Sequence, residues 1–429
     1  MTSVNGRSDA GPGPPSTSSP PVGTPSRPLE GLRVIELSSY VAAPLCGLTL
    51  AQLGADVIRV EPPGGTNDRS RWPLAESGQS LYWDGLNLGK RAIEVNLDSP
   101  GGAELVADLV CAGGPAGGVL VTNSTRYPAL SYEALATRRP DVIHVQLLGR
   151  RNGGTSVDYL AQVGSGMPLI TGHPDPDGRP GEPVNQVLPA WDVAAGLYLA
   201  TGLVAAERHR VVTGEGQSIR VALDDVALST LSTLGYYAEA HLNGVERAPI
   251  GNEVYGSLGR DLTTADGARL YLLVLTPRHW NDLLDLTGLH ARMAEIEREV
   301  GGDFASESDR FAHRRRIFAL LDPWFADRSW DEVSSGLART KVLWAPYRSF
   351  RDVVAHDAKT LRDDPMFHEV DQPGVGPTLR AGMPLTMAGR DAVPTPAPAV
   401  GQHTHEVLTE VLGDRPAQPA SLPEPSRPA

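Results

Sequence analysis

Asp192 is the carboxylate in this sequence best placed to do chemistry. It follows Leu-Pro-Ala-Trp and precedes an apolar stretch with no further charge until Glu207, which predicts a helix over 193–209 with Asp192 as its N-cap. The positive end of a helix dipole favours an ionised carboxylate, and apolar surroundings remove part of its hydration. An ordinary capping aspartate explains this placement. A carboxylate nucleophile that forms a covalent intermediate explains it as well.

A second carboxylate, Asp158, follows the glycine pair Gly153-Gly154 beyond a predicted strand at 142–147. Ligand sites of α/β proteins lie beyond the carboxyl ends of strands, although a helix cap is again the alternative. Arg150 and Arg151 follow the same strand. They are either solvated or available to bind a carboxylate or phosphate through two N–H groups.

Residues 251–259, Gly-Asn-Glu-Val-Tyr-Gly-Ser-Leu-Gly, are predicted to form a loop. Its backbone N–H groups can approach an anion closely, which makes Gly251, Asn252 and Gly256 candidates for an oxyanion-binding loop or lid; a flexible connection is the alternative. The sequence contains no GxGxxG, Walker A, GxSxG or HExxH pattern, and its two cysteines lie 65 positions apart. We therefore expect no metal site, no disulfide and no permanently bound cofactor.

Short β-branched runs alternate with helical patterns in the first half of the chain. The predicted strands are 32–37, 57–61, 92–97, 119–122, 142–147 and 217–223. Helices are predicted between them, including 44–53, 100–110 with Asp98 or Ser99 as its cap, and a short helix capped by Ser131. Strands alternating with helices predict a parallel sheet covered on both faces, that is, a Rossmann-like α/β domain.

The pattern changes near residue 224, where a helix at 225–242 leads into mainly helical segments with a strand at 269–275. We expect a large Rossmann-like domain at 29–224, to which 396–415 returns, and a linker and smaller α+β domain at 225–395. The terminal segments 1–28 and 416–429 are rich in proline, glycine and serine and are predicted to be disordered tails.

Composition excludes several classes of protein. The 429 residues carry a net charge of −13, which argues against a nucleic-acid surface. The longest apolar run, 193–206, is shorter than the ~20 residues that a membrane span requires. Few cysteines without pairing motifs favour a reducing, cytoplasmic location.

Several separated segments resemble the class III coenzyme A transferases in the same order. They are LEGLRVIELSSYVAAPLCGLTLAQLGADVIRVEPPGG, GKRAIEVNLDSPGG, ERHRVVTGEGQSIRVAL and GQHTHEVLTEVLG, which together extend over about residues 29–413. The resemblance implies an acyl-CoA substrate, with coenzyme A bound only as part of that substrate. It also implies an interlocked homodimer in which the large domain of one subunit faces the small domain of the other.

The resemblance places the catalytic aspartate at Asp192. We expect Asp158 to have an auxiliary role, orienting the substrate or handling protons. Arg150 or Arg151 would hold a free substrate carboxylate. The implied CoA groove comprises Ser39, Tyr40, Val41, Pro62, Val95, Asp98, Asn123 and Ser124. The cationic pair Lys90-Arg91 lies near this groove in sequence and either binds CoA or is solvated at a strand edge.

Within the family, GRRNGGTSVDY, VLPAWD, GNEVYGSLGRD and VLWAPYR resemble the branch that moves CoA between the two carboxylates of one mesaconate. Three alternatives stay open: CoA transfer between separate acids, racemisation of a 2-methylacyl-CoA, and CoA binding without catalysis. Racemases of the family carry a His-Asp pair where this sequence has Val157-Asp158, and valine cannot act as a base.

Overall fold

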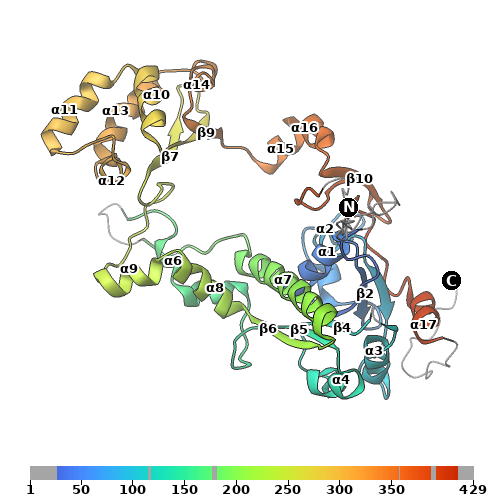
Figure 1. Cartoon of the computed structure of the whole chain (residues 1–429). Coiled ribbons are helices and arrows are strands. Elements are labelled where there is room, and N and C mark those ends of the chain that lie inside the picture. Colours follow the sequence, from blue (N-terminus) through green and yellow to red (C-terminus); the bar gives the residue numbers. More distant parts are fainter. Residues whose placement is uncertain (1–26, 115–116, 176–180, 357, 388–392, 414–429) are drawn as a thin grey trace, which may run out of the picture.

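The computed structural model describes residues 27–114, 117–175, 181–356, 358–387 and 393–413 (Figure 1). Nearly all of the two predicted tails, residues 1–26 and 416–429, lie outside the described residues. The chain builds a large α/β domain, continues into a smaller domain, and returns to the large domain through a second connection (Figure 1).

A six-stranded parallel sheet forms the centre of the large domain, with strand order β3-β2-β1-β4-β5-β6. Its strands are β1 (Arg33–Leu37), β2 (Asp56–Glu61), β3 (Arg91–Glu94), β4 (Val119–Thr122), β5 (Ile143–Leu148) and β6 (Gln217–Ala222). All six predicted strands are present, and this order is that of a Rossmann fold. The predicted α/β class is confirmed.

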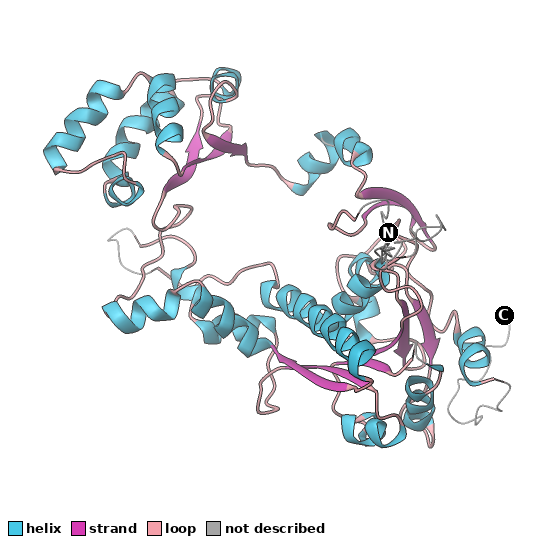
Figure 2. Cartoon of the chain, viewed as in Figure 1, coloured by secondary structure: helices cyan, strands magenta, loops and turns pink. Residues whose placement is uncertain are grey.

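Helices cover both faces of this sheet (Figure 2). One face carries α1 (Ala42–Gln52), α7 (Ala190–Thr213) and α8 (Leu223–Thr233), and the other carries α3 (Gly102–Cys111), α4 (Tyr132–Arg138) and α17 (Thr404–Leu412). The connections contain η1 (Asn67–Ser70), α2 (Leu81–Asn87), η3 (Pro128–Leu130), α5 (Asp158–Ser165) and α6 (Met167–Ile170). Ser131 caps α4 as predicted, whereas α3 begins after Gly101, without a side-chain cap from Asp98 or Ser99.

Helices α1 and α7 pack closely because Gly196 has no side chain. A Cβ at this position would lie 2.7 Å from the carbonyl oxygen of Ala42. The two helices therefore meet at backbone distance, which brings the start of α7 beside the start of α1.

The small domain has its own core around an antiparallel sheet of β7 (Leu258–Thr263), β8 (Arg269–Val274) and β9 (Leu343–Pro346). Its helices are α10 (Pro277–Thr287), α11 (His290–Val300), α12 (Glu307–Ala312), α13 (Arg314–Ala326) and α14 (Trp330–Leu337). The return connection contains α15 (Phe350–His356), α16 (Ala358–Asp363) and the hairpin β10 (Phe367–Gln372) and β11 (Gly376–Ala381).

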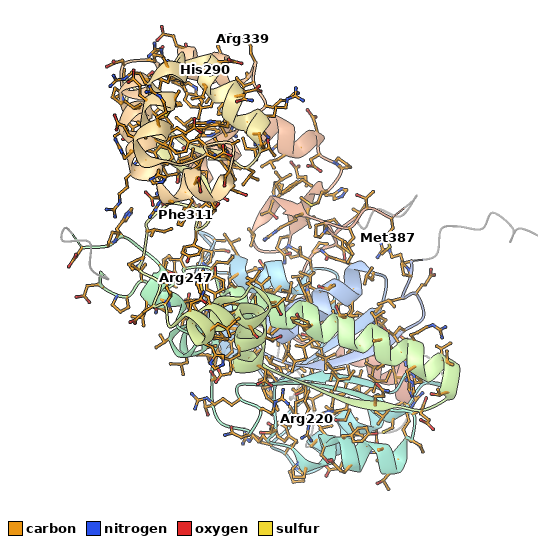
Figure 3. All side chains as sticks on the ribbon, turned by 60° about the vertical axis from the view of Figure 1, so that its left-hand side comes forward. Arg220, Arg247, His290, Phe311, Arg339 and Met387 are labelled. Carbon is orange, nitrogen blue, oxygen red and sulfur yellow. The ribbon has the colours of Figure 1, made fainter. Side chains whose placement is uncertain are left out.

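The helix predicted at 225–242 is broken in two. Gly235 adopts a φ of 82° between α8 and α9 (Tyr236–Asn243). Beyond α9, the guanidinium of Arg247 lies 3.8 Å from the centre of the Tyr255 ring, and Tyr255 packs against Phe311 of α12. Figure 3 shows Phe311 at the end of the small domain that faces Arg247. No helix in the described part of the chain is long and apolar enough to cross a membrane.

A network of buried charges lies at the carboxyl ends of β1 and β2. Arg59 is fully buried and contacts Glu36 at 2.9 Å, Glu61 at 3.4 Å and Asp68 at 3.6 Å. The ammonium group of Lys90 lies 2.9 Å from Glu36. Gly47 of α1 leaves room for this network, because a Cβ there would lie 1.7 Å from the Glu36 carboxylate.

Removing the central cation of this network is expected to destabilise the large domain. Arg59→Met leaves Glu36 and Asp68 buried with one fewer cationic partner, a change that typically costs about 3–5 kcal/mol. Urea unfolding followed by circular dichroism measures the loss. The control is Arg292→Met, since Arg292 pairs with Glu295 at an exposed position and should contribute less than about 1 kcal/mol. Equal unfolding midpoints for the two variants would show that the buried network does not stabilise the domain.

Candidate active site

A cavity of about 640 Å³ opens where the strand order reverses between β1 and β4. In open α/β sheets, ligands bind in this crevice beyond the carboxyl ends of the strands. Ser39, Tyr40 and Val41 line it after β1, and Asn123 lines it after β4. Asp158 from α5 and Asp192 from α7 line it as well, so the cavity brings together residues from four separate predicted segments.

The N-terminus of α7 is capped by Asp158 and not by Asp192. The helix begins at Ala190, two residues before Asp192, which places Asp192 in its first turn. One carboxylate oxygen of Asp158 accepts the backbone N–H groups of Trp191 at 2.7 Å and of Asp192 at 3.0 Å. The predicted capping role of Asp192 is therefore wrong, because a carboxylate 34 residues earlier already binds the free N–H groups.

The Asp192 carboxylate is consequently available for reaction. Among the described residues it makes no hydrogen bond and no ion pair, and it faces the cavity. Burial, together with the negative charge of Asp158, raises the pKa of Asp192 to about 6, against the opposing positive charge of Arg71. A partly desolvated carboxylate of raised basicity is suited to attack a carbonyl carbon.

Three aromatic and cationic residues of the β2–β3 connection complete the cavity. Arg71, Trp72 and Tyr82 line it. The guanidinium of Arg71 lies 5.4 Å from the ring centre of Tyr40 and 5.2 Å from that of Tyr82, within range of cation–π attraction. None of the three was predicted from the sequence. Their one signal is position, since the connection after β2 begins at the same sheet edge as Ser39 and Asn123.

The turn after β1 is held in an unusual conformation. Tyr40 has a φ of 67°, in the left-handed region that non-glycine residues rarely adopt. Its backbone N–H donates to Asp68 at 2.8 Å, and Asp68 is held by Arg59. Asn123 donates to the carbonyl oxygen of Ser39 at 3.0 Å and ties the two cavity loops together. The buried charge network thus determines the shape of this cavity wall.

Six residues predicted in or near the CoA groove do not line the cavity. Lys90 has a fully buried side chain that donates to Glu36, Asn87 and the carbonyl of Pro44, so its charge does not reach the crevice. Val95 is buried in the core. Arg91 pairs with Asp56, Glu406 and Glu410 and fastens α17 to the sheet. Asp98 pairs with Arg126, while Pro62 and Ser124 lie outside the cavity lining.

The predicted carboxylate-binding arginines are also placed elsewhere. Arg150 pairs with Asp224 at 3.0 Å and Arg151 with Asp225 at 2.8 Å, both at exposed positions outside the cavity lining. Their charges are already neutralised at the start of α8.

The loop containing Gly251, Asn252 and Gly256 lies between α9 and β7 and is not part of the cavity lining. Gly251 donates its N–H to the carbonyl of Gly172, and Asn252 donates to Asp261. Within one chain, this loop therefore contributes no donor to the Asp192 cavity. Across the described ranges, no cluster of three or more His, Cys, Asp or Glu side chains could hold a metal ion.

Comparison with known proteins decides the family. Residues 29–404 match the family model described as CoA-transferase family III. The chain belongs to CoA-transferase family III. It is therefore an enzyme of the CoA-transferase type that acts on CoA thioesters, as the sequence segments predicted.

Relatives of known name agree with this assignment. The chain is 46% identical over 387 residues to 2-methylfumaryl-CoA isomerase of Chloroflexus aurantiacus, covering 90% of this chain and 94% of that protein. It is 28% identical to succinyl-CoA:mesaconate CoA-transferase of Haloarcula marismortui, covering 89% and 96% of the two chains. A solved CaiB/BaiF family protein from Brucella suis superposes with a TM-score of 0.73 at 27% identity, covering 90% of this chain and 100% of that one.

The raised pKa of Asp192 predicts how the substitution Asp192→Asn changes the stability of the fold. A carboxyl group with a raised pKa in the folded state stabilises the fold below the unfolded pKa near 4, and this contribution is lost as the pH rises through 6. Asp192→Asn, neutral at every pH, should therefore be more stable than wild type at pH 7, by up to about 3 kcal/mol. The difference in stability between the variant and wild type should vanish below pH 4. Thermal unfolding of both proteins at pH 7 and below pH 4 measures it.

If the ionised Asp192 carboxylate is the group that attacks the substrate, kcat/KM of wild type should fall below an apparent pKa near 6. Asp331 provides the matched control, since it lies in the first turn of α14 but is exposed. If Asp331→Asn raised stability at pH 7 as much as Asp192→Asn, burial of Asp192 would not be the cause.

Asp158 is expected to act on the reaction through Asp192. Asp158→Asn removes the like charge that helps to raise the pKa of Asp192, so the acid limb of the kcat/KM profile should move to lower pH. The variant should also weaken the cap of α7 by about 1 kcal/mol. Ser131→Ala removes a cap of α4 and should cost similar stability without moving the pH profile. A profile that stays in place in Asp158→Asn would limit Asp158 to a structural role.

Proposed function

We propose that this enzyme transfers CoA between the two carboxylates of one mesaconate, converting 2-methylfumaryl-CoA into 3-methylfumaryl-CoA. The observation that carries the proposal is the 46% identity, over almost the whole length of both chains, to an enzyme named for this isomerisation. A cavity with one unpaired, partly buried carboxylate, Asp192, supports the same chemistry.

Asp192 is proposed as the covalent nucleophile. Its carboxylate attacks the thioester carbonyl, the C–S bond breaks, and a mixed anhydride and CoA thiolate result. The thiolate attacks the Asp192 acyl carbon and releases the mesaconate carboxylate, which leaves an aspartyl-CoA thioester. The other carboxylate of mesaconate attacks this thioester and expels the thiolate, which then forms the new thioester and regenerates Asp192. No proton is consumed overall.

Backbone donors at the start of α1 are suited to stabilise the oxyanions of these steps. Val41 and Ala42 line the cavity at the N-terminus of an 11-residue helix, where N–H groups lack partners within the helix. The loop at Gly251, Asn252 and Gly256 remains a second proposed source of donors. In the interlocked homodimer that we propose, it would serve the site of the other subunit.

Exposed apolar residues support this dimer. Around the cavity, 77% of Trp72 and 92% of Val187 are exposed, and Leu242 on α9 and Phe350 on α15 are 77% and 95% exposed. Exposed apolar surface of this kind is typical of surfaces that a partner covers. The two domains are joined by two separate connections, so that the chain forms an open ring through which a second copy could interlock (Figure 1). We place the enzyme in the cytoplasm, consistent with its two free cysteines.

Isotope labelling tests whether CoA transfer is intramolecular. The enzyme is incubated with 2-methylfumaryl-CoA and labelled free mesaconate, and the CoA esters are analysed by mass spectrometry. We expect 3-methylfumaryl-CoA without label, because a retained carboxylate reacts at a far higher effective concentration than a dissolved one. Added succinate should not become a CoA ester. Asp192→Ala should lower the rate by on the order of 10³-fold or more.

Label entering the CoA ester in proportion to turnover would assign the enzyme to CoA transfer between separate acids, as in the Haloarcula relative. Near-normal turnover by Asp192→Ala would contradict the covalent mechanism itself.

A further inference from the structure

The cavity contains one cation whose charge no carboxylate neutralises. Among the described residues that line the cavity, Arg71 is the only lysine or arginine, and its guanidinium makes no hydrogen bond or ion pair with any described residue. By contrast, Arg150 and Arg151 each have a carboxylate partner within 3.0 Å. Arg71 is therefore free to bind an anionic group of the substrate.

The surroundings of Arg71 hold it in place without using its guanidinium N–H groups. Its backbone N–H donates to the carbonyl oxygen of Asp68, which anchors it just after η1. Its guanidinium faces the rings of Tyr40 and Tyr82. Cation–π attraction to the rings stabilises the positive charge in part but uses none of the guanidinium N–H groups. These N–H groups remain open along the edge of the planar guanidinium, and their geometry matches the two oxygens of a carboxylate.

Tyr82 adds a second unused donor. Its hydroxyl oxygen is buried and has no hydrogen-bond partner among the described residues. Buried polar groups are nearly always paired, so an orphaned hydroxyl beside a cavity indicates a ligand. Burial raises the pKa of Tyr82 to about 12, so the hydroxyl keeps its proton and can donate it to an anion.

We propose that Arg71 and the Tyr82 hydroxyl bind the free carboxylate of the acyl group, at the opposite end from the carbonyl attacked by Asp192. This inference rests on the proposed function. The subsite makes and breaks no covalent bond. It retains the dicarboxylate after the first half-reaction, while the two carboxylates exchange places between Arg71 and Asp192. It also selects CoA thioesters of dicarboxylic acids over those of monocarboxylic acids.

Two thioesters that differ in this carboxylate test the subsite. Tiglyl-CoA has a methyl group where 2-methylfumaryl-CoA has its free carboxylate. The readout is the rate of CoA adduct formation on Asp192, measured by intact-protein mass spectrometry. Arg71→Gln should slow the reaction of 2-methylfumaryl-CoA by roughly 10- to 100-fold, the value of a charge-assisted hydrogen-bonded pair, and should not slow the reaction of tiglyl-CoA. It should also release free mesaconate that wild type retains.

Tyr82→Phe removes a hydroxyl without a partner among the described residues, so it should fold normally and show a smaller loss of the same selectivity. Arg328→Gln is the matched control, because its guanidinium lies 4.2 Å from the Trp324 ring centre in the small domain. That variant should treat both thioesters as wild type does.

Equal loss with both thioesters in Arg71→Gln, or no loss with either, would overturn the subsite. Failure of the proposed function gives a different result: wild type would form the adduct and distinguish the two thioesters without producing 3-methylfumaryl-CoA.

Discussion

The proposed chemistry of this site depends on the two hydrogen bonds that the Asp158 carboxylate accepts from the N-terminus of α7. A helix that begins beside a cavity exposes N–H groups that a nearby carboxylate will bind. If Asp192 bound them, its charge would be dispersed over hydrogen bonds and its nucleophilicity reduced. Asp158 binds them instead, and Gln162 holds the other oxygen of Asp158 at 2.5 Å. One carboxylate thus has a structural role, and this leaves the other free to react.

The opposite wall of the cavity depends on buried charge. Glu36 and Arg59 lie on the adjacent strands β1 and β2, and their side chains are buried. Arg59 positions the carboxylate of Asp68, which accepts the backbone N–H of Tyr40. The backbone carbonyl of Asp68 accepts the N–H of Arg71. A left-handed tyrosine persists only where its surroundings determine its conformation. The desolvation cost of such a network is large, and paired charges with many hydrogen bonds offset it. The fold therefore has a buried polar network directly beneath residues that line the cavity.

The sequence predicted the sheet well because buried parallel strands are short β-branched runs, and each of the six is present. Asp192 was predicted as a site residue from its place at the start of a helix, and the family resemblance placed the turn after β1 and Asn123 in the CoA groove; all of these line the cavity. The sequence did not predict the break at Gly235, because the apolar pattern continues across that residue.

Contacts between distant residues account for the other differences. Lys90 is adjacent to groove segments in sequence, but its side chain lies beneath α1, where the missing side chain of Gly47 leaves room for it. Arg71 lies in an irregular segment after η1 and Tyr82 in the short helix α2, so their convergence with Asp192 depends on the tertiary fold.

The charges around Asp192 also link substrate binding to reactivity. In the free enzyme, Arg71 lowers the pKa of Asp192, while burial and Asp158 raise it. A substrate carboxylate bound to Arg71 would neutralise the one opposing charge and displace water from the cavity. Both effects make the Asp192 carboxylate more basic at the moment when a thioester carbonyl lies beside it. A thioester without the second carboxylate would leave the charge of Arg71 unpaired and Asp192 less basic, so selection of the dicarboxylate and activation of the proposed nucleophile would follow from the same ion pair.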